Sequence, residues 1–80
     1  MYYVYLIEST TYPTARYVGF STDLKQRIAE HNSGKNQSTS ACRPWCLVTY
    51  LAFSEKQKAL KFESYLKSGS GRAFANKRLW

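Results

Sequence analysis

The pattern of hydrophobic positions along the chain predicts three strands. Residues 2–7, YYVYLI, are apolar on both alternating faces, which is typical of a central strand covered on both sides. Residues 16–20, RYVGF, predict a second strand. Because the polar segment 9–15 between them is short, we expect an antiparallel hairpin. Residues 46–53, CLVTYLAF, predict the third strand.

The positions after the second strand predict a helix. A serine, threonine or aspartate at 21–23 is the expected N-cap, the helix runs to about Asn32, and Gly34 follows its end. Residues 33–45 are rich in serine, asparagine, glutamine and lysine. They therefore predict a long polar loop between this helix and the third strand.

A second helix is expected after the third strand. Ser54 and Gln57 form a capping box that opens it, and it runs to Ser68, where the sequence SGSG breaks it. Residues 72–79 predict a short last helix. The order of elements is therefore β-β-α-β-α-α, which predicts one α+β domain over residues 1–80.

The first predicted helix directs two polar side chains toward its apolar face. With Leu24 at zero, Ile28 falls at about 40° around the helix. His31 falls at about 340° and Arg27 at about 300°, so His31 shares the apolar stripe and Arg27 lies at its edge. An arginine and the only histidine of the chain are unexpected there, because burying unpaired polar groups is costly.

Glu63 is the matching exception on the second helix. With Ala59 at zero, Glu63 falls at about 40° and Leu66 at about 340°, so the carboxylate lies inside an apolar arc. One interpretation is structural: a buried or half-buried Arg27–Glu63 ion pair, with His31 as a satisfied core histidine. The other is a functional site that uses all three polar residues.

The charge of the chain favours a polyanionic partner. Twelve Lys+Arg against five Asp+Glu give a net charge of +7 over 80 residues, and seven tyrosines accompany them. We therefore expect nucleic acid to be the partner. No apolar run approaches the roughly 20 residues needed to span a bilayer, and the N-terminus has no signal-type segment. These features predict a cytoplasmic protein without a membrane partner.

The acidic residues limit the kind of metal site that the chain can build. Asp23 and Glu55 fall in first turns of helices, Glu30 on the solvent side of the first helix, and Glu8 at the end of the first strand. Only Glu63 lacks a routine structural role. A two-metal phosphodiesterase centre needs several carboxylates, whereas a single Mg²⁺ takes one or two together with waters and substrate phosphate. The sequence is therefore compatible with a one-carboxylate magnesium site.

Short motifs occur in a fixed order along the predicted elements. Residues 3–5, YVY, lie in the first strand and residues 17–19, YVG, in the second; Arg27 and His31 follow as R-x-x-x-H, and Glu63 lies within ALKFESYLK. With these motifs the chain resembles the GIY-YIG nuclease superfamily, and is similar to its small stand-alone single-domain members. The resemblance covers essentially the whole chain, including RPW before the third strand and KSGSGRAF near the end.

The resemblance implies a small three-stranded antiparallel sheet flanked by helices, and Mg²⁺-dependent hydrolysis of phosphodiester bonds, with Mn²⁺ as a substitute ion. It implies that Tyr5 and Tyr17 line the cleft beside the attacking water, and that Arg27 stabilises the scissile phosphate. His31 matches a position that assists proton transfer in some members. Glu63 matches the single metal-binding carboxylate.

Together these features predict a divalent-metal-dependent endonuclease that acts on DNA in preference to RNA. Because the predicted elements leave no recognition module, we expect a preference for substrate structure with little sequence specificity, and a setting in DNA repair or recombination. The alternative is a non-catalytic nucleic-acid-binding protein on the same scaffold. A homodimer or a specificity-conferring protein partner is left open. The expected nucleic-acid contacts are Arg16, Lys35, Arg43, Lys67, Arg72 and Asn76.

Overall fold

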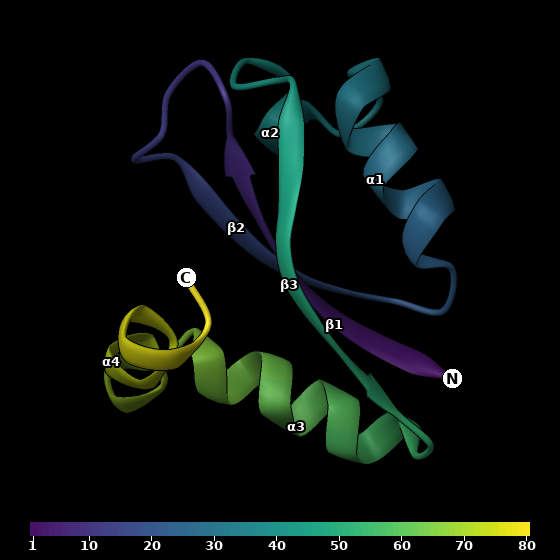
Figure 1. Cartoon of the computed structure of the whole chain (residues 1–80). Helices are drawn as coiled ribbons and strands as arrows, with labels where there is room; N and C mark the ends of the chain where they lie inside the picture. The colour runs from purple at the N-terminus through teal and green to yellow at the C-terminus, as the bar shows by residue number, and fades with distance from the viewer.

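Three antiparallel strands form the centre of the molecule (Figure 1). In this computed structural model, which describes all 80 residues, they are β1 (Tyr2–Ser9), β2 (Arg16–Ser21) and β3 (Trp45–Phe53), in the order β2-β1-β3. β1 is therefore the central strand, as its two apolar faces predict. Residues 4–7 of this strand are fully buried, because helices cover both of its faces.

Helices lie on both sides of the sheet (Figure 1). α1 (Leu24–Ser33) and the short α2 (Gln37–Ser40) lie on one side, and α3 (Lys56–Leu66) and α4 (Gly69–Arg78) on the other. The predicted α+β class and the antiparallel sheet are thus confirmed. The longest helix has 11 residues, and none has the length and hydropathy that a membrane-spanning helix requires.

Each face of β1 contributes to its own apolar cluster. Val4 and Leu6 point to one side and pack with buried residues of α3 and α4. Tyr5 and Ile7 point to the other side, where they pack with Trp45 and with the apolar face of α1. Because side chains alternate along a strand, Tyr5 is directed toward the helix that carries Arg27 and His31.

The predicted boundaries of α1 are confirmed at both ends. Asp23 is the N-cap, and its carboxylate accepts a hydrogen bond from the backbone N–H of Gln26 at 3.0 Å. Gly34 is the C-cap, with φ 84°, a left-handed conformation that favours glycine. The caps therefore fix where α1 begins and ends, and with them the position of His31 in its last turn.

The prediction of a continuous loop over residues 33–45 is wrong, because the segment contains α2. Asn36 caps this four-residue helix, and its side-chain oxygen accepts from the backbone N–H of Ser38 at 3.0 Å. The helix has the sequence QSTS, so no hydrophobic period marks it. Its one buried residue is Thr39.

The predicted capping box of Ser54 and Gln57 is also wrong. The N-cap of α3 is Glu55, the helix begins at Lys56, and no side-chain cap bond is formed. The backbone of Glu55 is still extended, with φ −118° and ψ 128°. The extended conformation thus continues past Ser54, and the helix begins one residue later than a Ser54 cap requires.

The SGSG sequence does more than end α3. The hydroxyl of Ser68 accepts a hydrogen bond from the backbone N–H of Gly71 at 3.2 Å, which makes Ser68 the N-cap of α4. α4 therefore begins at Gly69 and not at residue 72. α3 itself ends at Leu66, before the predicted Ser68.

Candidate active site

The hydroxyl of Tyr5 lies directly against the backbone of Gly19. The two residues are opposite one another on β1 and β2. A Cβ added at Gly19 would lie 2.8 Å from Cε1 of Tyr5 and closer still to its hydroxyl oxygen. No side chain fits there unless Tyr5 moves, so the glycine of the YVG motif is required by the tyrosine of the YVY motif.

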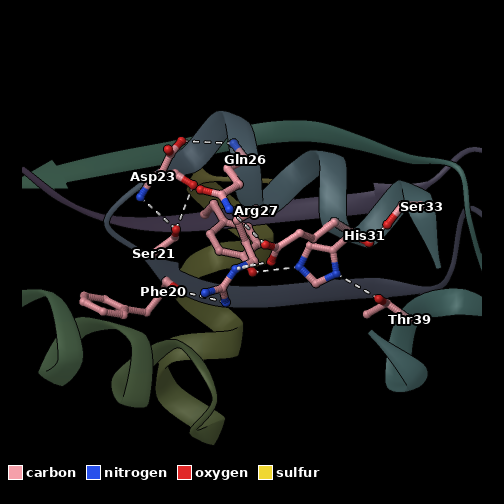
Figure 2. A network of polar contacts seen from close by, with 10 residues as sticks. Phe20, Ser21, Asp23, Gln26, Arg27, His31, Ser33 and Thr39 are labelled. Carbon is pink, nitrogen blue, oxygen red and sulfur yellow. Dashed lines mark hydrogen bonds and ion pairs between the residues drawn. The ribbon is translucent and has the colours of Figure 1, made fainter. Parts of the chain in front are cut away.

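His31 of α1 is the hydrogen-bond partner of the Tyr5 hydroxyl. Nε2 of His31 is hydrogen-bonded to the Tyr5 hydroxyl at 2.8 Å, and both residues are 0% exposed. The other ring nitrogen, Nδ1, is hydrogen-bonded to the hydroxyl of Thr39 on α2 at 2.8 Å (Figure 2). His31 is therefore satisfied at both nitrogens.

Tyr17 completes an aromatic group around this hydrogen bond. Its ring centroid lies 6.3 Å from that of Tyr5 and 5.1 Å from that of His31. Tyr17 is half-buried, whereas the other two are fully buried. It is therefore the member of this group that faces solvent.

Arg27 lies at the exposed edge of the same group. It pairs with Glu30 one turn along α1, with Nε to Oε1 at 3.3 Å, and Nη1 donates to the backbone carbonyl of Phe20 at 3.5 Å (Figure 2). The Arg27 side chain is 42% exposed and that of Glu30 36% exposed. Glu30 is thus half-buried and does not lie fully on the solvent side as predicted. Arg27 keeps donors free for a ligand at this edge, since a guanidinium has five.

Glu63 pairs with Lys67, the residue that caps the C-terminal end of α3. Nζ of Lys67 donates to Oε2 of Glu63 at 3.0 Å, and the Glu63 side chain is 20% exposed. Nζ of Lys67 also lies 5.9 Å from the ring centroid of Tyr17, so Glu63 and Tyr17 border a common region. The Arg27–Glu63 ion pair of the structural interpretation does not form, because Arg27 pairs with Glu30 and Glu63 pairs with Lys67.

The surroundings keep Tyr5 and His31 uncharged at neutral pH. Burial and the neighbouring Tyr17 raise the pKa of Tyr5 to about 12, although the charge and hydrogen bonding of Arg27 act in the opposite direction. Burial, followed by the positive charge of Arg27, lowers the pKa of His31, against a smaller opposite effect of Glu30. The resting pair is therefore a phenol and a neutral imidazole.

The donors of the site fit only a lightly held metal ion. No group of three or more histidine, cysteine, aspartate or glutamate side chains lies close enough to hold a metal. Glu63 is a single, partly exposed carboxylate, and Lys67 competes for it. This fits a hydrated Mg²⁺ shared with a substrate phosphate, the form in which this ion is often bound by one carboxylate.

The structure brings four of the six predicted nucleic-acid contacts together. Arg16, Lys67, Arg72 and Asn76 line one cleft of about 350 Å³ with Tyr17. The indole of Trp80 also lines it and lies under the guanidinium of Arg16, 4.8 Å from Cζ to the ring centroid. The sequence analysis did not single out Trp80.

The other two predicted contacts lie elsewhere. Lys35 lines a separate cavity of about 330 Å³ beside Arg27 and His31. Arg43 places its guanidinium over Gly34 at the end of α1. Thr39 is the functional-site residue that the sequence analysis missed altogether, because nothing in a polar segment distinguishes one threonine from its neighbours.

Comparisons with known proteins show the family to which the chain belongs. The family model of the GIY-YIG catalytic domain matches residues 1–78. UPF0213 proteins of Streptococcus pyogenes serotypes M5 (strain Manfredo) and M1 are each 35% identical over 72 residues, which cover 89% of this chain and 76% of theirs. The solution NMR structure of the UPF0213 protein BH0048 from Bacillus halodurans is similar, with 32% identity, a TM-score of 0.57, and 96% of this chain and 84% of that chain covered.

Proposed function

The chain belongs to the GIY-YIG family, and from this premise we propose that it is a divalent-metal-dependent endonuclease that hydrolyses phosphodiester bonds in DNA. The observation that carries the proposal is that Arg27 and Glu63 border one aromatic group, although they come from helices on opposite sides of the sheet. Arg27 lines a cavity with His31, and Lys67, which is bonded to Glu63, lies 5.9 Å from the ring centroid of Tyr17. A cation for phosphate and a carboxylate for a metal ion thus flank the same aromatic group.

Arg27 is the residue that we assign to the scissile phosphate. Its half-exposed guanidinium is held by Glu30 and the Phe20 carbonyl, and it would donate to phosphate oxygens as negative charge builds on them. The pair with Glu30 is a partly exposed i,i+3 pair and is worth at most about 1 kcal/mol. A phosphate would therefore displace it readily.

Tyr5, Tyr17 and His31 are assigned to proton transfer. A tyrosine whose pKa is about 12 is a weak acid, so its proton leaves at neutral pH only if an acceptor is already in contact with it. Nε2 of His31 is such an acceptor, at 2.8 Å from the Tyr5 hydroxyl. Tyr17, the exposed member of the group, would contact the attacking water.

Glu63 is the residue that we assign to the metal ion. When bound there, Mg²⁺ or Mn²⁺ would supply charge stabilisation for the phosphate and the leaving oxygen. The substrate would bring further oxygen ligands, since the chain offers one carboxylate at this point. Lys67 would then be released toward the DNA backbone.

The cleft beside the site supports nucleic acid as the substrate. Arg16, Lys67 and Arg72 give it a positive lining, in keeping with the net charge of +7, and such contacts bind the backbone without reading its sequence. A preference for substrate structure over sequence therefore fits better than recognition of a long site.

The test is a cleavage assay on labelled single-stranded, duplex and branched DNA, with Mg²⁺, Mn²⁺ or a chelator. We expect metal-dependent cutting by the wild type and its loss in Arg27→Gln and Glu63→Gln. The matched controls are Lys25→Gln on α1 and Glu55→Gln at the start of α3, two exposed residues that should leave the rate unchanged. Binding of all three DNAs without cutting would instead favour the non-catalytic alternative.

A further inference from the structure

Thr39 is a buried residue whose hydroxyl contacts the only histidine of the chain. It is 1% exposed, and its Oγ1 lies 2.8 Å from Nδ1 of His31 (Figure 2). A neutral imidazole carries one proton, so one of its nitrogens donates and the other accepts. The partner of Nδ1 therefore decides what Nε2 offers to Tyr5.

The hydrogen-bond partners of Thr39 allow His31 to be protonated on Nδ1. The Thr39 hydroxyl has one proton and can donate it to the backbone carbonyl of Asn36 at 3.4 Å, which turns a lone pair of its oxygen toward Nδ1 at 2.8 Å. Nδ1–H then donates to Thr39, and Nε2 is left with the lone pair that faces the Tyr5 hydroxyl at 2.8 Å.

The surroundings of Tyr5 favour the same protonation state. Nε2 of His31 is the hydrogen-bond partner of the Tyr5 hydroxyl, at 2.8 Å, and both residues are 0% exposed. A buried phenol needs an acceptor for its proton, so the Tyr5 hydroxyl donates and Nε2 accepts.

We propose that Thr39 is a positioning residue that holds the proton of His31 on Nδ1, so that Nε2 is the acceptor for the proton of Tyr5. If this proton moves, the O–H bond of Tyr5 breaks, an N–H bond forms at Nε2, and the products are a phenolate and an imidazolium. No other proton is exchanged, and Nδ1–H remains bonded to Thr39. The consequence for the rate of DNA cleavage rests on the proposed function, whereas the protonation state of His31 does not.

The backbone around Thr39 is fixed by contacts from a strand and from its own cap. Nε1 of Trp45 on β3 donates to the Thr39 carbonyl at 2.9 Å. The Thr39 N–H donates to the carbonyl of Asn36 at 3.1 Å. α2 thus holds one hydroxyl against His31, which gives a physical reason for a four-residue helix at this point.

The direct test is the protonation state of His31 in the wild-type protein. Because His31 is the only histidine, long-range ¹H–¹⁵N correlation spectra of labelled protein report on it alone. We expect Nδ1 to be protonated and Nε2 to be unprotonated at neutral pH. The reverse assignment overturns the proposal, whether or not the protein cuts DNA.

Variants of Thr39 test the role of the hydroxyl. Thr39→Val keeps the shape and removes the hydroxyl, so we expect the proton to shift toward Nε2 and cleavage to fall roughly tenfold or more, within the range of positioned acid–base groups. Thr39→Ser keeps a hydroxyl, so it should keep the proton of His31 on Nδ1 and the cleavage rate near that of the wild type. The matched control is Ser40→Ala, which removes a hydroxyl of the same helix that bonds only to the Gln37 carbonyl.

The variants also separate this proposal from the proposed function. If Thr39→Val keeps the proton on Nδ1 and cuts at the wild-type rate, Thr39 has no positioning role. If the wild type does not cut any DNA, the spectra of the wild type and of Thr39→Ser still decide the protonation state. If Thr39→Val fails to fold, the spectra of the wild type and of Thr39→Ser still decide which nitrogen of His31 is protonated, and protonation at Nε2 overturns the proposal.

Discussion

The hydroxyl of Tyr5 occupies the space that a side chain at Gly19 would need. The two residues pair across β1 and β2, and a Cβ at Gly19 would overlap the hydroxyl end of the tyrosine. The space left by the glycine lets the tyrosine reach Nε2 of His31, 26 residues away along the chain. The YVY and YVG motifs thus specify one contact between neighbouring strands.

Gly19→Ala should therefore destabilise the protein and displace Tyr5. We expect a loss of about 1–3 kcal/mol in the free energy of unfolding, as for overpacking in a core. Urea unfolding gives this value. The control is Gly69→Ala at the start of α4, where a Cβ meets no atom within 4 Å; this change should be neutral or stabilising by up to about 1 kcal/mol. Equal stability of Gly19→Ala and wild type would contradict the close contact.

The raised pKa of Tyr5 predicts a loss of stability at high pH. The unfolded chain releases the proton of Tyr5 near pH 10, whereas the folded protein holds it up to about pH 12. The folded state therefore binds more protons between these values, and the free energy of unfolding falls as the pH rises, by about 3 kcal/mol at most. Urea unfolding from pH 8 to 12 measures it, and Tyr5→Phe should show a shallower decline. Parallel curves for the two proteins would contradict the assignment.

The lowered pKa of His31 predicts a loss of stability on acidification. Below its ordinary value of 6.5 the unfolded chain binds a proton at His31 that the folded protein does not yet accept. The free energy of unfolding should therefore fall as the pH drops from 6.5 toward the lower folded pKa, and then level off for this group. Comparing wild type with His31→Gln over this range isolates the effect from the carboxylates. An equally steep decline in the variant would show that His31 is not the cause.

Lys67→Met should lower the Mg²⁺ concentration needed for cleavage. Lys67 is bonded to Glu63 at 3.0 Å, so its removal frees the carboxylate for the ion. Because a partly exposed pair is worth at most about 1 kcal/mol, we expect a two- to fivefold decrease, roughly. A Mg²⁺ titration of the cleavage rate measures it, and the control is Lys61→Met, an exposed residue of α3. An unchanged requirement for Mg²⁺ would argue against Glu63 as the metal ligand.

The sheet and α1 could be predicted from local sequence patterns and from individual capping residues. The apolar faces of residues 2–7 predicted the central strand. A capping side chain at 21–23 and Gly34 marked the ends of α1, and the structure identifies Asp23 as the N-cap. Arg27 and His31 were found because they interrupt a hydrophobic period on this helix. The local sequence is enough to predict an element when its hydrophobic pattern and its capping residues fit only one type of secondary structure.

The remaining features depend on contacts between distant segments. Thr39 is buried because Trp45 and His31 contact it from other elements. The polar sequence around Thr39 does not predict these contacts. Arg27 pairs with Glu30 of α1, and Glu63 pairs with Lys67 at the C-terminal end of α3. The inward arc of each helix suggested that the two residues pair with one another, but spacings of three and four residues provide closer partners.

The most direct measurement compares DNA binding and DNA cleavage by Glu63→Gln in the same preparation. The amide keeps the size of the side chain and removes the charge that a metal ion requires. Catalysis at Glu63 predicts that cleavage falls on the order of 100-fold or more. The affinity for DNA measured without a divalent metal ion should be retained, because the carboxylate without its ion repels phosphate. Cleavage at the wild-type rate by Glu63→Gln would contradict a metal-dependent active site at this position.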